Sequence, residues 1–296
     1  MKVLVTGASG LFGSKLVETA EKKGYEVYSG DIVNQTLHGI PVRFDISDKK
    51  QVDATFDRIN PDAVVHCAAM TDVDECETAK DLAWRINVVG TEHIVEAAKR
   101  SGAFLIYVST DFVFDGKKGR YDEEDTPAPV NYYGLTKLEA ERRVQDLAEK
   151  YCIVRASVIF GSTPAVGKVN FALWLLGKLR RKEQVNIVTD QWNSPTLNSN
   201  MSEMTLEILE LKLEGIIHVS GATRVSRYDF ARLLAQTFSL DSNLIKAASA
   251  ADFSWPANRP RDSSLSVTKA RRLLKNKPLK ISRALLRLRK EIDSCR

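Results

Sequence analysis

Tyr133 and Lys137 are the residues whose chemical types and spacing point most directly to catalysis. They stand four residues apart in a segment of strong helix formers, so both side chains would lie on one helix face. A tyrosine with its ordinary pKa of about 10 transfers a proton poorly at neutral pH. A nearby ammonium group favours the phenolate, so we expect Lys137 to lower the pKa of Tyr133. The pair predicts a general acid–base site, in which the hydroxyl of Thr110 hydrogen-bonds the same substrate oxygen.

The position of this pair distinguishes it from an ordinary surface pair. It is the only Tyr-x-x-x-Lys match in the chain. The apolar segment GAFLIYVST precedes it and predicts a buried strand that ends in Ser109 and Thr110. The loop between strand and helix is rich in glycine, proline and acidic residues, and loops of that length are commonly functional. We therefore assign the catalytic role to Tyr133 and not to the adjacent Tyr132, which lacks a lysine four residues on.

The start of the chain predicts a site for a phosphate group. The apolar residues 3–5 indicate a buried strand, and Gly7, Gly10 and Gly13 follow it at three-residue spacing. A helical pattern then continues to Gly24. Glycine lets the backbone turn tightly and approach an anion, and the helix N-terminus offers free N–H groups. Strand, turn and helix in this order predict dinucleotide binding.

Asp31 ends the next predicted strand, YEVYSGD. An acidic side chain at this position accepts hydrogen bonds from the adenosine ribose hydroxyls and repels a 2′-phosphate. Asp31 therefore favours NAD(H), with NADP(H) possible.

Strands and helices alternate along the first half of the chain, which predicts an α/β fold with a doubly wound parallel sheet. We expect a dinucleotide-binding domain over residues 1–160. Residues 161–296 are expected to form mostly a smaller substrate-binding lobe, with segments that return to the sheet. A single long helix is expected over residues 77–102.

The composition is that of a soluble globular protein, with 44% hydrophobic and 27% charged residues in 296. No segment has the length of a membrane span, and the N-terminus does not resemble a signal peptide. The cysteines and histidines are too dispersed for a disulfide framework or a metal site. These features predict a cytoplasmic protein without a bound metal.

Basic residues dominate the chain from Lys269 onward. Such a tail could bind nucleic acid or an anionic membrane. We favour an amphipathic helix that keeps its basic residues in water, so neither partner is expected. Its apolar residues would face the body of the protein, namely Ile281, Leu285, Leu286 and Leu288.

Several segments resemble those of extended short-chain dehydrogenases/reductases, namely TGASGLFG, CAAMTDVDECE, YVSTDFVFDG and YYGLTK. Within that superfamily the chain is similar to the dTDP-4-dehydrorhamnose reductases, through STDFVFDG, DQWNSPT and RPRDSSLSVTKAR. The similarity extends over residues 2–272. It implies a Rossmann domain and reduction of the C4 ketone of a nucleotide-linked 4-keto-6-deoxysugar. The expected reaction converts dTDP-4-dehydro-L-rhamnose to dTDP-L-rhamnose.

The resemblance also implies individual site residues. Tyr133 would protonate the C4 oxygen while NAD(P)H supplies hydride, Lys137 and Thr110 would assist, and Asn87 would support a proton relay through Lys137. Ser109 would lie beside the nicotinamide. The expected cofactor contacts are Gly7, Gly10, Leu11, Phe12, Gly13, Asp31, Asp45, Ile46, Cys67, Ala68, Ala69, Asn87, Ser109, Tyr133 and Lys137. The candidate substrate contacts are Thr110, Asp111, Asn170, Gln191 and Arg259.

Two other functions stay open at this point. The segments GAFLIYVSTDFVFDG and EEDTPAPVNYYGLTKLE also resemble the regulatory subunit of methionine adenosyltransferase, which shares the fold and NADP binding but acts as a partner. A nucleotide-sugar 4-epimerase would use the same tyrosine, lysine and hydroxyl group. Val158 stands where reductases often have tryptophan. A homodimer is compatible with the sequence, which specifies neither the sugar nor the oligomeric state.

Overall fold

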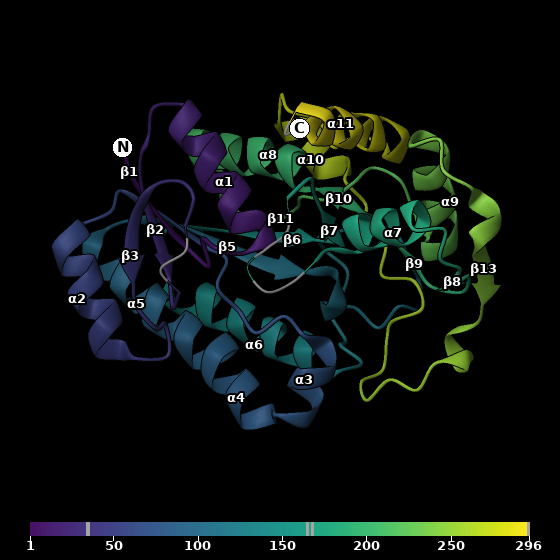
Figure 1. Ribbon diagram of the computed structural model, residues 1–296. Coiled ribbons are helices and arrows are strands. Elements are labelled where there is room, and N and C mark those ends of the chain that lie inside the picture. Colours follow the sequence, from purple (N-terminus) through teal and green to yellow (C-terminus); the bar gives the residue numbers. More distant parts are fainter. Residues whose placement is uncertain (34–35, 164–165, 167–168, 295–296) are drawn as a thin grey trace.

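A seven-stranded parallel sheet in the order β11-β6-β5-β4-β1-β2-β3 forms the centre of the molecule (Figure 1). The structure is a computed structural model that describes residues 1–33, 36–163, 166 and 169–294. The strands are β1 (Lys2–Thr6), β2 (Glu26–Asp31), β3 (Ile40–Arg43), β4 (Ala63–His66), β5 (Phe104–Thr110), β6 (Tyr151–Ala156) and β11 (Gly215–His218). Because the chain winds outward from β1 in both directions, this order confirms the predicted doubly wound α/β fold.

Helices cover both faces of the sheet (Figure 1). Helices α1 (Leu11–Lys22) and α8 (Asn198–Leu211) lie on one face, and α2 (Lys49–Ile59), α5 (Gly90–Ser101) and α6 (Tyr132–Leu147) lie on the other. Successive side chains of a strand point to opposite faces, so Val3 and Val5 pack in the first layer and Leu4 in the second. The apolar centre of β1, residues 3–5, is therefore buried on both sides.

The C-terminal half forms a smaller layer around its own core. Its strand pairs are β7 (Ile159–Phe160) with β10 (Thr196–Leu197), β8 (Val185–Val188) with β13 (Ile245–Ala248), and β9 (Trp192–Asn193) with β12 (Val225–Ser226). Its helices are α7 (Phe171–Arg180), α9 (Arg227–Thr237), α10 (Thr268–Leu273) and α11 (Ile281–Ser294). Helices α8 and α10 and strand β11 return to the main sheet from this half of the chain. The division near residue 160 stays a prediction.

The single helix expected over residues 77–102 is wrong. The chain instead forms α3 (Val73–Thr78), α4 (Lys80–Trp84) and a π-helical turn (Arg85–Val89) before α5. The backbone leaves the helical region at Ala79, where φ is −117°. Apolar periodicity cannot reveal the extra residue of a π-turn, and such turns are frequent at functional sites.

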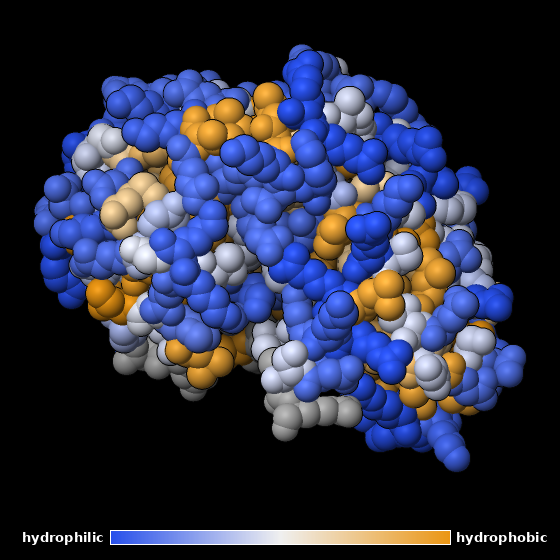
Figure 2. Space-filling view, turned by 90° about the horizontal axis from the view of Figure 1, so that it is seen from above, coloured by the Kyte–Doolittle hydropathy of each residue, from blue (hydrophilic) through white to orange (hydrophobic). Residues whose placement is uncertain are grey.

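Helix α11 packs against the C-terminal core through Ile281, Leu285 and Leu288, which are buried. The expectation for Leu286 is wrong, because its side chain is 55% exposed and points to the other side of the helix. Figure 2 views the face formed by α1, α8 and α11, where hydrophilic residues predominate and hydrophobic patches are small. Among the described residues, no helix is long and apolar enough to cross a membrane.

Candidate cofactor and substrate site

The turn between β1 and α1 leaves room for an anion and for no side chain. Gly7 has φ of +67°, and a Cβ placed on it would lie 2.7 Å from the Ala68 nitrogen. A Cβ on Gly13 would lie 2.2 Å from the Gly7 carbonyl oxygen. Gly10 precedes α1 and provides no capping side chain, so among the described residues the first N–H groups of the helix have no side-chain acceptor. This cradle fits the pyrophosphate of a dinucleotide.

A hydrogen-bonded chain joins this turn to the end of β4. The Thr6 hydroxyl oxygen accepts the backbone N–H groups of Cys67 and Ala68, both at 3.2 Å. The hydroxyl proton is then free to bond His66 Nδ1 at 2.6 Å, and His66 Nε2 lies 3.1 Å from the Thr91 hydroxyl. Burial lowers the pKa of His66 to about 3, so the ring is neutral. The predicted cofactor-path residues follow β4 and are half-buried, namely Cys67, Ala68 and Ala69.

The carboxylate of Asp31 is tied to the same turn. It accepts the backbone N–H of Ser9 at 2.9 Å and that of Val33 at 3.3 Å. The predicted ribose ligand therefore lies next to the predicted phosphate cradle, at the carboxyl edge of the sheet.

The other residues expected near the adenosine differ in exposure. Phe12 is buried in the core below α1, whereas Leu11 is half-buried. Asp45 is half-buried, and Ile46 is buried directly against Gly90, where a Cβ would lie 2.9 Å from the isoleucine side chain. Phe12 and Ile46 thus serve the core, and any contact with a cofactor would involve their edges or backbone.

Tyr133 and Thr110 meet at the carboxyl end of β5. Burial raises the pKa of Tyr133, and a hydrogen bond with the Thr110 hydroxyl opposes that shift. The expectation that Lys137 lowers the Tyr133 pKa is therefore wrong for this state of the chain. The Lys137 ammonium instead donates to the Val108 carbonyl at 2.8 Å and lies 4.2 Å from the centre of the Tyr107 ring. Tyr133 is a neutral phenol, as a proton donor must be.

Burial also shifts the protonation equilibrium of Lys137, whose side chain is 3% exposed. Desolvation lowers the pKa of Lys137 to about 7, and the Glu141 carboxylate opposes this shift. A lysine that titrates near neutral pH can lose or accept a proton during turnover.

Asp111 joins three loops above the sheet. Its buried carboxylate accepts hydrogen bonds from the hydroxyls of Thr110 at 3.1 Å, Ser157 at 2.8 Å and Ser263. Thr110 ends β5, Ser157 follows β6, and Ser263 belongs to the loop before α10. Asp111 thus fixes the hydroxyl that Tyr133 contacts, although it was expected to contact substrate directly. Burial raises the pKa of Asp111 to about 6.

The raised pKa of Asp111 predicts a pH-dependent stability. Between about pH 4 and 6 the folded chain holds a proton on Asp111 that the unfolded chain releases, so this site's contribution to the unfolding free energy falls as pH rises through that window. Relative to the Asp111→Asn variant, the free energy of unfolding of the unmodified chain should fall by about 2 kcal/mol over this pH window. Urea unfolding of both chains at pH 4.5 and 7 measures the difference. A difference that is constant with pH would contradict the assignment.

The side chains of Ser109, expected beside the nicotinamide, and of Asn87, expected to act through Lys137, point to other partners. The Ser109 hydroxyl donates to Glu141, which forms a buried ion pair with Arg155 at 2.6 Å, so the Ser109 side chain faces the core. The Asn87 side chain bonds both backbone groups of Met70, at 2.8 and 3.1 Å. Asn87 also donates to the Thr136 hydroxyl at 3.0 Å. No bond joins Asn87 to Lys137 among the described residues, and the relay stays a prediction.

The predicted sugar-nucleotide contacts make internal bonds in this structure. Asn170 caps α7 and donates to the Gly161 carbonyl at 3.1 Å. Gln191 is buried next to the start of α9. Arg259 holds the Asp74 carboxylate through two hydrogen bonds of 2.9 and 2.7 Å. For Arg259 to bind a substrate anion, this ion pair must open or be shared.

A family model described as the RmlD substrate binding domain matches residues 1–293. The chain belongs to this family. It is 33% identical to a dTDP-4-dehydrorhamnose reductase of Aggregatibacter actinomycetemcomitans, over 97% of this chain and 98% of that one. The crystal structure of a Bacillus anthracis dTDP-4-dehydrorhamnose reductase in complex with NADP superposes with a TM-score of 0.89 at 31% identity, covering 98% and 99% of the two chains. The β subunit of Xenopus laevis methionine adenosyltransferase 2 is 31% identical over 83% of this chain and 74% of that one.

Arg227 lies near the candidate site and was not singled out by its sequence pattern. Its Nε atom is buried without a hydrogen-bond partner among the described residues, and its guanidinium lies 5.7 Å from the Phe171 ring. Burial and Arg259 lower the pKa of Arg227, while Asp111 opposes them, so the three side chains share one region. The local signal was an arginine directly after the helix cap Ser226, which is too common to be selective.

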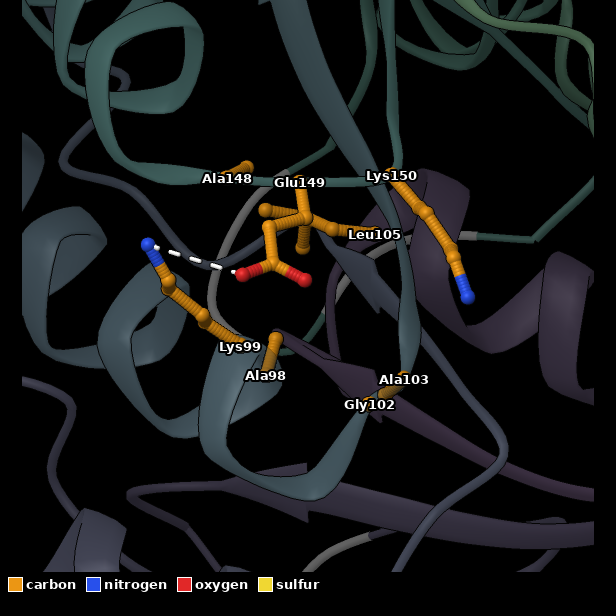
Figure 3. A pocket seen from close by; sticks show the side chains of 8 residues that line it. All are labelled: Ala98, Lys99, Gly102, Ala103, Leu105, Ala148, Glu149 and Lys150. Carbon is orange, nitrogen blue, oxygen red and sulfur yellow. Dashed lines mark ion pairs between the residues drawn. The ribbon is translucent and has the colours of Figure 1, made fainter.

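A shallow pocket at the opposite edge of the sheet is separate from this site. Figure 3 shows it between the end of α5 and the loop before β6, where Lys99 and Glu149 form an ion pair at 3.7 Å. Leu105 lines it near the start of β5, whereas Thr110 ends that strand. It therefore cannot share a ligand with Tyr133.

The glycine cradle can be tested with Gly13→Ala. The new methyl group would lie 2.2 Å from the Gly7 carbonyl oxygen, far inside van der Waals contact. The turn must therefore open, and the backbone N–H groups that would hold the phosphate must move apart. We expect the Kd for NADH to rise by about tenfold or more, which corresponds to about 1.4 kcal/mol. Gly177→Ala in α7 is the matched control, because its Cβ would meet only the end of the Arg181 side chain at 3.4 Å. Fluorescence titration compares them, and equal affinities would contradict the cradle.

Proposed function

We propose that this chain reduces the C4 ketone of a nucleotide-linked 4-keto-6-deoxysugar, converting dTDP-4-dehydro-L-rhamnose to dTDP-L-rhamnose. The observation that carries the proposal is the neutral Tyr133, which lies beside Thr110 at the same sheet edge as the glycine cradle. The A. actinomycetemcomitans relative is named for this activity, and the B. anthracis structure contains NADP. Family membership and a proton donor thus support the same reaction.

Each residue has a defined task in this proposal. A bound nicotinamide cofactor supplies the hydride that reaches C4 of the sugar. Tyr133 donates its proton to the C4 oxygen as negative charge develops there. The Thr110 hydroxyl, whose single proton bonds Asp111 in this structure, would turn that proton towards the same oxygen. Lys137, which has two N–H donors besides the one bonded to Val108, would hold the nicotinamide ribose, and its positive charge would favour the phenolate that Tyr133 becomes.

Asp31 would accept the hydroxyls of the adenosine ribose and so favour NADH. The rest of the predicted cofactor set would line the path from the cradle to Lys137. Asn170, Gln191 and Arg259 are proposed to contact the sugar nucleotide, and Arg227 joins them because its buried Nε has no partner among the described residues. We place the protein in the cytoplasm, where its nucleotide-linked substrate and reduced cofactor would be available.

The X. laevis relative favours one competing function, a cofactor-bound regulatory subunit. To separate the two, purified protein is mixed with NADH or NADPH and enzymatically prepared dTDP-4-keto sugar while absorbance at the reduced-nicotinamide band is recorded. Substrate-dependent oxidation supports the reductase. A stable complex with a methionine adenosyltransferase catalytic subunit on size exclusion, without oxidation, would instead support the regulator. A 4-epimerase would interconvert 4-hydroxy sugars without net oxidation of added cofactor.

A further inference from the structure

Arg43 lies beside Asp31 at the edge of the cofactor cradle. The two residues are direct neighbours in the parallel pairing of β2 and β3. Neighbours in register point to the same face of a sheet, and Asp31 faces the glycine turn through its bond to Ser9. The Arg43 side chain therefore emerges on the side of the sheet where α1 begins.

The contacts of Arg43 leave most of its hydrogen-bonding capacity unused. Its Nε donates to the Ile32 carbonyl at 3.2 Å, which holds the exposed side chain over the end of β2. Among the described parts of the chain, no carboxylate forms an ion pair with Arg43. The four N–H donors at the tip of the guanidinium are thus available to a ligand next to Asp31.

Asp31 is restrained where Arg43 is free. Two backbone N–H groups hold its carboxylate, one from Ser9 and one from Val33. These bonds partly compensate its negative charge and direct it towards the turn. A phosphate on the ribose 2′ position would meet one restrained carboxylate and one uncompensated guanidinium at the same place.

We propose that Arg43 is a specificity-determining residue that binds the 2′-phosphate of NADP(H) and so allows the chain to use both nicotinamide cofactors despite Asp31. The guanidinium would pair with the phosphate oxygens through charge-assisted hydrogen bonds while its Nε keeps the Ile32 carbonyl. This inference rests on the proposed cofactor site, and it does not depend on which sugar is reduced.

Arg43→Gln is the test variant, because it removes the charge from an exposed position and keeps a donor for Ile32. Arg58→Gln is the matched control, since Arg58 is an exposed arginine of α2 on the other layer. Calorimetric titrations of both variants and the unmodified chain use NADPH, NADH, adenosine 2′,5′-bisphosphate and 5′-AMP. Binding is measured without sugar substrate, so a failed reductase assay would not affect the outcome.

We expect Arg43→Gln to raise the Kd for NADPH and for adenosine 2′,5′-bisphosphate by about tenfold. The Kd values for NADH and 5′-AMP should change by less than about twofold. Arg58→Gln should leave all four affinities unchanged. Raising the salt concentration should weaken binding of adenosine 2′,5′-bisphosphate to the unmodified chain more than to the Arg43→Gln variant. Equal losses for phosphorylated and unphosphorylated ligands, or no loss for either, would overturn the proposal.

Discussion

Replacing Tyr133 with phenylalanine is expected to lower kcat by about 10²- to 10⁴-fold and to leave the Kd for NADH nearly unchanged. The phenol lies beside the Thr110 hydroxyl, whose own proton is bonded to Asp111, so Tyr133 is the group expected to deliver the proton to the ketone oxygen. Phenylalanine keeps the ring and its edge-on packing against Phe112, whose centre is 6.0 Å away. The loss would therefore affect proton transfer and not folding.

Tyr132→Phe is the matched control for this experiment. The Tyr132 ring lies 5.3 Å from the Lys80 ammonium on the neighbouring helix, and its backbone N–H bonds Glu77. Removing its hydroxyl should change kcat less than about twofold. Stopped-flow oxidation of NADH compares the two variants, and undiminished turnover by Tyr133→Phe would remove Tyr133 from the mechanism.

Replacing Glu141 with alanine is expected to destabilise the fold by about 3–5 kcal/mol. Glu141 and Arg155 are 1% and 2% exposed, and two hydrogen bonds of 2.9 and 2.6 Å join them. Without the carboxylate, the guanidinium stays buried and uncompensated, and its Nη1 already lacks a partner among the described side chains. The Ser109 hydroxyl would lose its acceptor as well.

The exposed ion pair between Arg143 and Glu92, at 3.4 Å, gives the control on the same helix. Arg143→Ala should cost less than about 1 kcal/mol, because water screens that pair. Urea unfolding followed by circular dichroism measures both variants, and Glu141→Gln replaces Glu141→Ala if the latter does not fold. If both α6 variants lowered the free energy of unfolding by the same amount, burial of the pair between Glu141 and Arg155 would have no special effect, which would contradict the prediction.

The features that the sequence predicted correctly depend on neighbours along the chain. The apolar run before Gly7, the glycine spacing and the acid at the end of the second strand are local patterns, and the doubly wound sheet follows from their repetition. The proximity of Tyr133 and Thr110 could also be predicted, because a helix start and a strand end converge at the carboxyl edge of a parallel sheet.

The features that were missed depend on residues distant in sequence. Ser263 reaches Asp111 from 152 positions away, and the Arg259 bond to Asp74 spans 185. The direction of the Lys137 ammonium was also unpredictable, because the Val108 carbonyl and the Tyr107 ring compete for it once β5 packs under α6. Periodicity alone contains no information about such competition.

The most direct test of the central claim follows the transferred hydrogen. The protein is incubated with dTDP-4-dehydro-L-rhamnose and a reduced nicotinamide cofactor carrying deuterium at both C4 positions, and the sugar product is examined by mass spectrometry and NMR. The reductase account predicts dTDP-L-rhamnose with a single deuterium at C4 of the sugar, formed in equal amount to the oxidised cofactor. Unlabelled product, or unreacted ketone with the cofactor still reduced, would contradict it.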